Sequence, residues 1–317
     1  MALLARRWIW RAGRKMYMAA RGEAPNHTLN HGELRLQRLV SRHLRPEARL
    51  VAFDVGARIG DWSAGLLGFA AGRPNRCEVH AFEPVPDSRA RIDASFSDHI
   101  ASGELRINAM ALSDAPGTVP IYVPHAIAGT STLHPDTTVN YEQVLQVAVS
   151  TVDEYCRANS IGNIDLLKVD TEGNDLRVML GAKELLRRGG IGVLQFEYNH
   201  RWIHARAYLK DVFDLIRGMP YRIAKICPNS LDIYVEWHPE LERFFETNYA
   251  LVHEELRMTL DCKMMRIGAG NACERVPESR LVPLEPAAVP NSAEGQVYAP
   301  ARAADARCEP SRVMISR

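Results

Sequence analysis

The chain has 317 residues, a formal net charge of +1 and an ordinary hydrophobic share of 46%. These values fit one large globular domain with extensions, and they exclude a strongly basic protein whose overall charge would attract nucleic acid. Six cysteines are scattered without a C-x-x-C pair, which favours reduced thiols in a cytoplasmic protein over a disulfide framework. No apolar run approaches the ~18 residues of a membrane span.

Residues 1–22 are basic, with aromatic and aliphatic side chains between the cations and no acid before Glu23. We expect a helix here, with two alternative uses. It can lie peripherally in a membrane interface, where tryptophan and arginine are both favoured, or it can pack on the domain that comes after it and bury its aromatic rings. A second helix is predicted over residues 33–44, where apolar residues recur largely at helical spacing.

A strand, a glycine turn and a helix come next. The apolar run from Leu50 to Val55 suits a strand buried on both faces of a parallel sheet, and Asp54 interrupts it near its carboxyl end. Gly56 and Gly60 bracket a tight turn before the helix. Glycines let the backbone approach a ligand closely, so this stretch is typical of a nucleotide-binding α/β unit. An ordinary strand-to-helix turn is the alternative.

A second strand is predicted over Glu78–Glu83, and Pro84 breaks it. In a doubly wound sheet, an acid at this strand end faces the ribose of a bound nucleotide and can accept bonds from both hydroxyls. A charge-assisted hydrogen bond of that kind contributes roughly 1.5–3 kcal/mol. The alternative is that Glu83 only caps the helix that begins near Pro86.

The middle of the chain predicts a third strand over Glu104–Ala109 and a further β segment over Gly117–Val123. Pro120 makes the latter an edge strand or a hairpin arm. The polar loop Gly129–Leu133 lies in a long irregular region, and such regions in compact domains are usually functional. Its hydroxyls could touch cofactor or substrate, or satisfy local backbone groups.

A fourth strand is predicted over Ile164–Val169, with Lys168 and Asp170 at its end and Glu172 in the turn after it. Ligands of doubly wound sheets bind beyond the carboxyl ends of the strands, where the strand order reverses. We therefore expect Asp54, Asp170 and Glu172 to share one crevice. Buried acids cost several kcal/mol unless paired, so a ligand site and a structural ion pair with Lys168 both stay open.

A fifth strand is predicted over Ile191–Glu197, followed by His200 and His204. These histidines are four residues apart and could share a helix face, but the spacing suggests no further ligand, so we predict no metal site. Two β segments, residues 221–226 and 231–235, predict a closing hairpin. A helical region is expected over residues 239–258.

Several motifs occur in one order: DVGARIGDWS, AFEPVP, NAMALSDAPGTVPIYV, GTSTL, VSTVDEYC, IDLLKVDTEGNDLRVMLGA and VLQFEYN. With them the chain resembles the FkbM-type S-adenosylmethionine-dependent methyltransferases from about Val51 to Val235. The resemblance implies a Rossmann-like class I methyltransferase fold, with a mostly parallel seven-stranded sheet, an antiparallel closing strand and helices on both faces. The sequence departs from the family pattern at Arg58, where asparagine is usual.

The expected organisation has four parts. A basic N-terminal segment and leading helix occupy residues 1–48, and the methyltransferase domain occupies residues 49–240. A helical extension is expected over residues 241–267, and a disordered tail over residues 268–317, where periodicity fades and proline, alanine, serine and arginine dominate.

The resemblance implies S-adenosylmethionine as cofactor and O-methylation of a hydroxyl on a sugar, glycolipid, polyketide or related natural product. The net charge close to zero predicts no nucleic-acid partner. A noncatalytic nucleotide-binding module that retains the fold is the alternative. An oxidoreductase is disfavoured because G-x-x-x-G replaces the dinucleotide fingerprint. The predicted cofactor contacts are Asp54, Gly56, Ala57, Arg58, Gly60, Glu83, Pro84, Ala111, Ser113 and Asp170.

An O-methyltransferase benefits from a general base, by a factor of roughly 10²–10⁴, because a hydroxyl is a poor nucleophile until its proton leaves. We predict Glu172 or His200 as that base, with Asp170 ordering the cofactor edge or the substrate. Arg58 has two interpretations: it pairs with the carboxylate of the cofactor, or it points into solvent.

Overall fold

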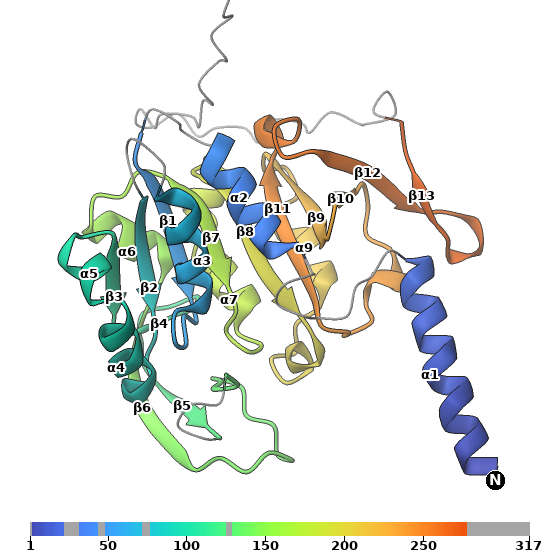
Figure 1. Ribbon diagram of the computed structural model, residues 1–317, viewed down its shortest axis with the longest axis horizontal. Coiled ribbons are helices and arrows are strands. Elements are labelled where there is room, and N and C mark those ends of the chain that lie inside the picture. Colours follow the sequence, from blue (N-terminus) through green and yellow to red (C-terminus); the bar gives the residue numbers. More distant parts are fainter. Residues whose placement is uncertain (1, 22–31, 44–47, 72–76, 125–128, 278–317) are drawn as a thin grey trace, which may run out of the picture.

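A computed structural model describes residues 2–21, 32–43, 48–71, 77–124 and 129–277 of the chain. One large twisted sheet runs through the molecule with helices on both of its faces, and a smaller sheet lies below it in Figure 1.

Parallel strands form the centre of the large sheet: β1 (Leu50–Val55), β2 (Cys77–Phe82), β3 (Leu105–Asn108), β7 (Ile164–Val169) and β8 (Ile191–Tyr198). They lie in the order β8-β7-β1-β2-β3. Ala52 of β1 is in register with Val79 on one side and Leu166 on the other. The chain extends from β1 through β2 and β3 in one direction and through β7 and β8 in the other. The strand order therefore reverses between β1 and β7, which is where doubly wound sheets bind ligands.

The sheet continues beyond β8 through β9 (Tyr221–Cys227), β10 (Ser230–Tyr234), β11 (Thr247–His253), β12 (Cys262–Ile267) and β13 (Cys273–Arg275). The full order is β13-β12-β10-β9-β11-β8-β7-β1-β2-β3, so the sheet has ten strands where seven were expected. β9 and β10 form the predicted antiparallel hairpin. β11 is inserted between β8 and β9 and runs antiparallel to both. The class I methyltransferase fold is thus present with extra strands at one edge.

The helical region expected over residues 239–258 and the helical extension over residues 241–267 are wrong. Strands β11 and β12 occupy this stretch, with only the short 3₁₀ helices η2 (Pro239–Leu241) and η3 (Glu254–Leu256) as helical turns. The apolar run that starts at Tyr249 fits a buried strand as well as a buried helix. Pairing with β8 and β9 decides for the strand, because both faces are then covered and the backbone groups are bonded.

The tail expected to be disordered from residue 268 is ordered for its first part. A 3₁₀ helix, η4 (Ala269–Asn271), leads into β13, which pairs with β12, and Val276 is buried. These contacts were not visible in the composition, because the partner strand β12 was itself predicted as helix. The remaining part of the predicted tail, residues 278–317, lies outside the described residues.

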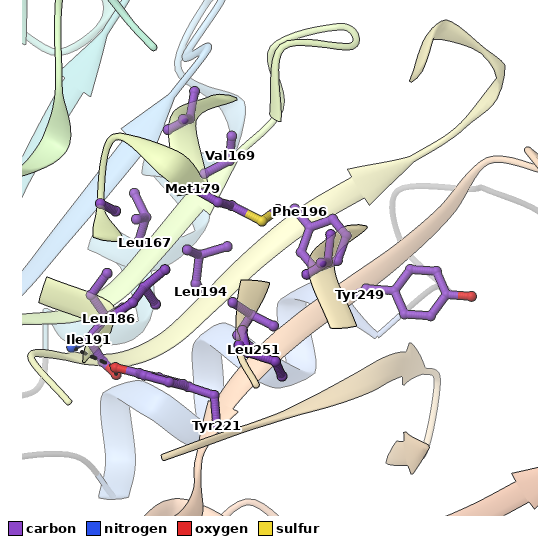
Figure 2. Close-up of a cluster of buried hydrophobic side chains, with 14 of the residues drawn as sticks. Leu167, Val169, Met179, Leu186, Ile191, Leu194, Phe196, Tyr221, Tyr249 and Leu251 are labelled. Carbon is purple, nitrogen blue, oxygen red and sulfur yellow. Dashed lines mark hydrogen bonds between the residues drawn. The ribbon is translucent and has the colours of Figure 1, made fainter. Parts of the chain in front are cut away.

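Two sets of helices cover the sheet. One face carries α2 (Glu33–His43), α3 (Asp61–Ala70) and α4 (Pro86–Ser95), followed by the short α5 (Ser97–Ala101). The other carries α6 (Val152–Ala158), α7 (Asp175–Leu180), α8 (Lys183–Arg187) and α9 (Leu209–Leu215). Figure 2 shows this second face, where Met179 and Leu186 lie over Leu167 and Leu194 of the sheet. The helices predicted before β1 and after its glycine turn are confirmed.

The smaller sheet has the order β4-β6-β5, from β4 (Ala111–Leu112), β5 (Gly117–Val123) and β6 (Gln143–Ser150). β5 is an edge strand, as Pro120 predicts. The backbone of Tyr122 pairs with that of Thr132 through N–O distances of 2.9 and 3.1 Å. This pairing brings the loop Gly129–Leu133 onto the smaller sheet.

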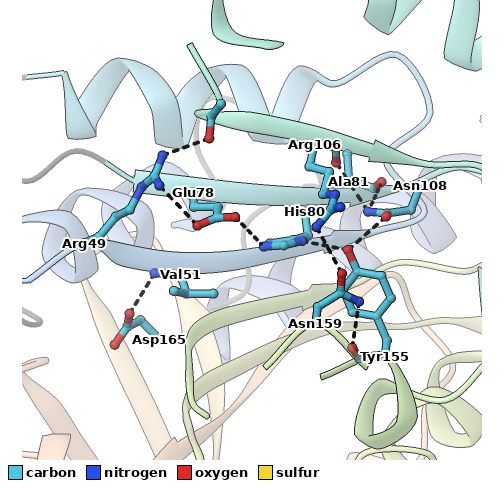
Figure 3. A network of polar contacts seen from close by, with 11 residues as sticks. Arg49, Val51, Glu78, His80, Ala81, Arg106, Asn108, Tyr155, Asn159 and Asp165 are labelled. Atoms are coloured by element: carbon cyan, nitrogen blue, oxygen red, sulfur yellow. Dashed lines mark hydrogen bonds and ion pairs between the residues drawn. The ribbon is translucent and has the colours of Figure 1, made fainter. Parts of the chain in front are cut away.

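A buried polar network ties α6 to the first strands (Figure 3). His80 Nδ1 lies 2.8 Å from the Tyr155 hydroxyl, which donates to Asn108 Oδ1 at 2.9 Å. Burial lowers the pKa of His80 to about 4, although the carboxylate of Glu78 lies 3.3 Å away. The Tyr155 ring also packs edge-on against Phe82, with 4.7 Å between centroids. The network therefore fixes the end of β2.

Helix α1 (Ala2–Ala20) projects from the body in Figure 1. Trp8 and Trp10 are 70% and 63% exposed, so the packing alternative, in which the helix buries its aromatic rings, does not hold for these two. Among the described residues, no helix is both long and apolar enough to span a membrane. The five described cysteines form no disulfide with one another.

Candidate active site

The turn after β1 requires glycine at two positions. Gly56 has a φ of 81°, and a Cβ there would lie 2.0 Å from the backbone oxygen of Asp170. Gly60 has a φ of 87°, and its Cβ would meet the Phe96 ring at 2.7 Å. The amides of Gly56 and Ala57 both donate to the Phe82 carbonyl, at 3.0 and 3.1 Å. The turn is therefore held against the end of β2, close to the end of β7.

Asp54 lies beneath this turn and is fully buried. It accepts a hydrogen bond from Ser63 Oγ at 2.7 Å and lies 3.3 Å from Lys168 Nζ. Lys168 also reaches Asp170 at 3.4 Å and the Gly56 carbonyl at 3.3 Å. Burial alone would lower the pKa of Lys168, but the carboxylates of Asp54 and Asp170 outweigh it and raise the pKa. The structural ion pair considered for Asp54 is thus present.

Glu83 directly follows β2 and accepts two backbone hydrogen bonds, from the amides of Arg58 and Val85 at 2.8 Å each. It joins the two turns that follow β1 and β2, and Val85 is the N-cap residue of α4. Burial raises the pKa of Glu83 to about 7, against the opposing effect of these two amide donors. A carboxylate has about four lone-pair sites, so two amide bonds leave capacity for a ligand.

The turn after β7 is strained. Glu172 has a φ of 57°, a left-handed conformation that costs a non-glycine residue roughly 1–3 kcal/mol and that clusters at functional sites. Thr132 Oγ1 donates to the Glu172 carbonyl at 2.7 Å, and Arg201 Nη1 lies 2.8 Å from Glu172 Oε2. A Cβ on Gly173 would lie 2.8 Å from the Arg201 carbonyl, so the turn packs tightly on the 3₁₀ helix η1 (His200–Ile203).

Burial and neighbouring carboxylates perturb the ionisation of this turn. Burial, followed by the charge of Asp170, raises the pKa of Glu172 to about 8, although Arg201 opposes the shift. Glu197, at the end of β8, is affected more strongly: burial first, and then Asp170 and Glu172, raise its pKa to about 10. Asn199 donates to Glu197 Oε2 at 2.7 Å.

Ligand atoms of Asp170, Glu172 and Glu197 lie within 4.8 Å of one another, a spacing that could hold a cation. The sequence did not indicate this group, because Glu197 comes from a different strand. His200 and His204 do not belong to it; His204 Nε2 instead lies 3.4 Å from Asp136.

One pocket opens at the carboxyl ends of β1, β2 and β7, where the strand order reverses. Its lining combines both strand-end turns, the smaller sheet and the Gly129–Leu133 loop. The lining residues are Val55, Gly56, Arg58, Phe82, Glu83, Pro84, Ser88, Ala111, Leu112, Ile121, Gly129, Ser131, Leu133, Asp170, Thr171, Glu172 and Asn174.

The site has two chemically different parts. The first, the β1–β2 wall, comprises Gly56, Arg58, Glu83 and Pro84. The second, the β7–β8 cluster, comprises Asp170, Glu172 and the adjoining Glu197. Helix α2 borders the β7–β8 cluster, because Gln195 of β8 donates a hydrogen bond to Glu33 in the first turn of α2. Burial raises the pKa of Glu33 to about 7, and the charge of Lys168 opposes this shift.

The pocket brings together most of the predicted site residues. Gly56, Arg58, Glu83, Pro84, Ala111, Asp170 and Glu172 line it. The other predicted residues lie behind or beside it: Asp54, Ala57, Gly60, Ser113 and His200. Ser113 is buried, with its hydroxyl 3.4 Å from Asn174 Oδ1, and His200 is exposed.

Asn174 and Arg201 contribute to the site although the sequence did not single them out. Asn174 is buried, lines the pocket and donates to the Leu112 carbonyl at 3.0 Å. An amide directly after the Thr-Glu-Gly turn was the available signal for it. The sequence gives no such signal for Arg201, because its ion pair with Glu172 forms only when η1 folds back onto the turn after β7.

The strand order, the glycine turn and the pocket at the switch point define a class I methyltransferase fold. Residues 54–223, more than half of the chain, match the model of the methyltransferase FkbM domain. The chain belongs to this family.

Two solved structures match the chain at low identity. One is methyltransferase FkbM from Methylobacillus flagellatus KT, with 16% identity, a TM-score of 0.42 and coverage of 64% of this chain and 44% of that chain. Another is an rRNA methylase from Streptococcus thermophilus, with 12% identity, a TM-score of 0.37 and coverage of 69% and 94%. The chain thus spans less than half the length of the first. No curated protein matches it.

Proposed function

We propose that the protein is an S-adenosylmethionine-dependent O-methyltransferase that acts on a hydroxyl of a sugar, glycolipid, polyketide or related natural product. The observation that carries the proposal is the joint lining of one pocket by the Gly56 turn, Glu83 and Glu172. These residues belong to three different strand ends, and the reversal of strand order makes their meeting point the ligand site of this fold.

The β1–β2 wall fits the cofactor. The missing side chain of Gly56 permits close approach of a ligand to the backbone, and the buried carboxylate of Glu83 can accept bonds from ribose hydroxyls. Bound there, S-adenosylmethionine supplies a methyl group activated by a sulfonium charge. Arg58, at the rim of the same wall, offers a cation to the carboxylate of the cofactor.

The β7–β8 cluster fits proton removal from the acceptor. Glu172 lines the pocket, and its pKa, raised by burial and by Asp170 to about 8, lies near the range in which a general base is effective. In this proposal Glu172 accepts the proton of the acceptor hydroxyl, while Arg201 and the Thr132 contact hold it in place. Glu172 is favoured over His200, which is exposed and outside the pocket lining.

The acceptor is proposed to be a small molecule or glycan, since the formal net charge of +1 gives no general attraction to nucleic acid. We propose that the protein works in the cytoplasm, which fits described cysteines that are mostly buried and form no disulfide with one another.

An acceptor screen with methyl-deuterated S-adenosylmethionine tests the proposal. Sugars, polyketides, amines and RNA are incubated with the protein, and mass spectrometry locates the transferred methyl group. We expect transfer to oxygen of a non-nucleic-acid acceptor, and loss of transfer in Glu172→Gln. Transfer to nitrogen or to RNA would contradict the acceptor class. Cofactor binding with no transfer to any acceptor would favour a noncatalytic module.

A further inference from the structure

Helix α1 has an apolar face that the other described residues leave exposed. The residues of this face recur at steps of three and four along the chain, which places them on one side of the helix. Trp8, Ile9 and Met16 are exposed to 70%, 71% and 67%. The apolar side is completed by small residues: Ala5, Ala12 and Ala19. A free helix of this composition would be expected to bury these side chains against something.

The opposite side of α1 contacts the body and fixes which face points outward. The Tyr17 hydroxyl donates to Glu240 Oε2 at 3.1 Å, and the guanidinium of Arg243 lies 5.1 Å from the Tyr17 ring centroid. The guanidinium of Arg14 lies 5.2 Å from the ring centroid of Phe245. At roughly 100° per residue, Arg14 lies about 160° around the helix from Ala12 and Met16, and Tyr17 lies about 140° from Ala12 and about 100° from Met16. The apolar face therefore points away from the protein.

The charges beside this face have one sign. Arg6 borders it on one side, and Arg11 and Lys15 border it on the other; all three are exposed. The helix has no acidic residue. A surface that receives the apolar face must therefore tolerate or attract several cations. A second copy of α1 would bring like charges together, whereas an anionic lipid surface complements them.

We propose that α1 binds the surface of an anionic lipid bilayer, with Trp8, Ile9 and Met16 inserted at the level of the headgroups. Arg6, Arg11 and Lys15 lie at the edges of the inserted face, where they meet phosphate and carboxylate groups. Tyr17 and Arg21 keep the helix attached to the body, since Arg21 also lies 3.5 Å from Glu240. The inference is independent of the methyltransferase proposal, because no residue of α1 lines the pocket.

Vesicle flotation of the full-length chain tests this inference. Vesicles are made of phosphatidylcholine with or without phosphatidylserine. One variant, Ile9→Asp with Met16→Asp, places charges on the apolar face. The control, Val144→Asp with Met258→Asp, makes the same changes at body positions that are 55% and 71% exposed. A further variant replaces Arg6, Arg11 and Lys15 by glutamine.

We expect the wild type and the control to float only with phosphatidylserine. The Ile9/Met16 variant should lose at least about tenfold in affinity, because charges in the interface oppose insertion. The glutamine variant should lose about fivefold for each cation removed, at low salt. Equal flotation of wild type and the Ile9/Met16 variant would overturn the proposal. So would dimerisation through α1 in sedimentation, abolished in the Ile9/Met16 variant, with no binding to vesicles.

Discussion

The β1–β2 wall and the β7–β8 cluster lie at the same pocket but differ in the number of their carboxylates and in the groups that surround them. The wall contributes one carboxylate, Glu83, which two backbone amides hold at 2.8 Å. The cluster brings three carboxylates within 4.8 Å, with Arg201 beside Glu172 and Lys168 beside Asp170. The pKa of Glu83 rises to about 7 through burial, whereas burial and mutual repulsion raise the pKa of Glu197 to about 10.

In the proposed function, this difference assigns ligand binding to the β1–β2 wall and proton transfer to the β7–β8 cluster. A carboxylate fixed by backbone amides is a preformed hydrogen-bond acceptor. Such preorganisation suits ligand recognition, because less ordering is needed on binding. In the strained turn, burial and the charge of Asp170 raise the pKa of Glu172 to about 8, a value that suits proton transfer. We therefore expect changes in the wall to alter affinity or folding and changes in the cluster to alter turnover.

The largest effect is expected from Glu172→Gln. The amide keeps the size of the side chain but cannot take a proton, so turnover should fall at least ~100-fold, the scale of a lost general base. Affinity for S-adenosylmethionine, measured by calorimetric titration, should stay unchanged. The companion variant His200→Gln should retain activity. Wild-type turnover in Glu172→Gln would rule Glu172 out as the base, and a matching loss in His200→Gln alone would assign the base to the histidine.

An effect of similar size, on stability instead of turnover, is expected from Gly56→Ala in the wall. The added Cβ would lie 2.0 Å from the Asp170 carbonyl, and a φ of 81° is unfavourable for alanine. We expect urea unfolding to show a loss of at least about 3 kcal/mol.

Gly68→Ala is the matched control for Gly56→Ala. Gly68 lies within α3, and nothing lies within 4 Å of a Cβ built there. Alanine should stabilise that helix by about 0.5–1 kcal/mol. Equal free energies of unfolding for Gly56→Ala and Gly68→Ala would show that the turns after β1 and β7 do not approach each other closely.

A smaller effect is expected from pH on cofactor binding. Burial sets the pKa of Glu83 at about 7, above its ordinary value, so the carboxyl group gains a proton as the pH falls through 7. The ionised form accepts the stronger hydrogen bonds from ribose hydroxyls. Affinity for S-adenosylmethionine should therefore be highest above pH 7 and fall by up to about tenfold below it.

Glu83→Gln removes this titration. Its affinity should be lower than that of the wild type at high pH and should not change with pH in this window. A wild-type affinity that is equally flat in calorimetric titrations across the window would show that Glu83 does not contact the ligand.

The smallest expected effect concerns Arg58, which has a φ of 52° where asparagine is usual in the family pattern. Asparagine tolerates this left-handed conformation better than arginine. Arg58→Asn should raise the free energy of unfolding by about 1 kcal/mol. Arg206 is exposed with a φ of 55° outside the pocket, so Arg206→Asn is the matched control.

Both asparagine variants should be stabilised to a similar degree. Weaker binding of S-adenosylmethionine by Arg58→Asn alone would show that the guanidinium pairs with the cofactor. Unchanged binding in both variants would place Arg58 in solvent and remove it from the β1–β2 wall.

Much of the site could be predicted from the sequence because it depends on local signals. Glycines in the turn after β1, and acids at the ends of β2 and β7, are set by neighbours along the chain, and the order of these strands follows from the fold class. Gly56, Glu83, Asp170 and Glu172 accordingly line the pocket as expected.

The rest depends on contacts between distant segments. The sequence predicts a helix where β11 lies, and only pairing with β8 and β9 makes this stretch a strand. Glu197 joins the cluster from β8, and Arg201 reaches Glu172 because η1 folds back on the turn. No spacing rule along the chain encodes these contacts.

The central claim is that this pocket binds S-adenosylmethionine through the β1–β2 wall. Calorimetric titration with S-adenosylmethionine and separately with NAD, on wild type, Glu83→Ala and Asp153→Ala, tests it most directly. Asp153 also accepts two backbone amides, at 2.8 and 3.0 Å, but lies outside the pocket lining. We predict binding of S-adenosylmethionine only, weakened by Glu83→Ala and not by Asp153→Ala. Binding of NAD alone, or of neither ligand, would contradict the account.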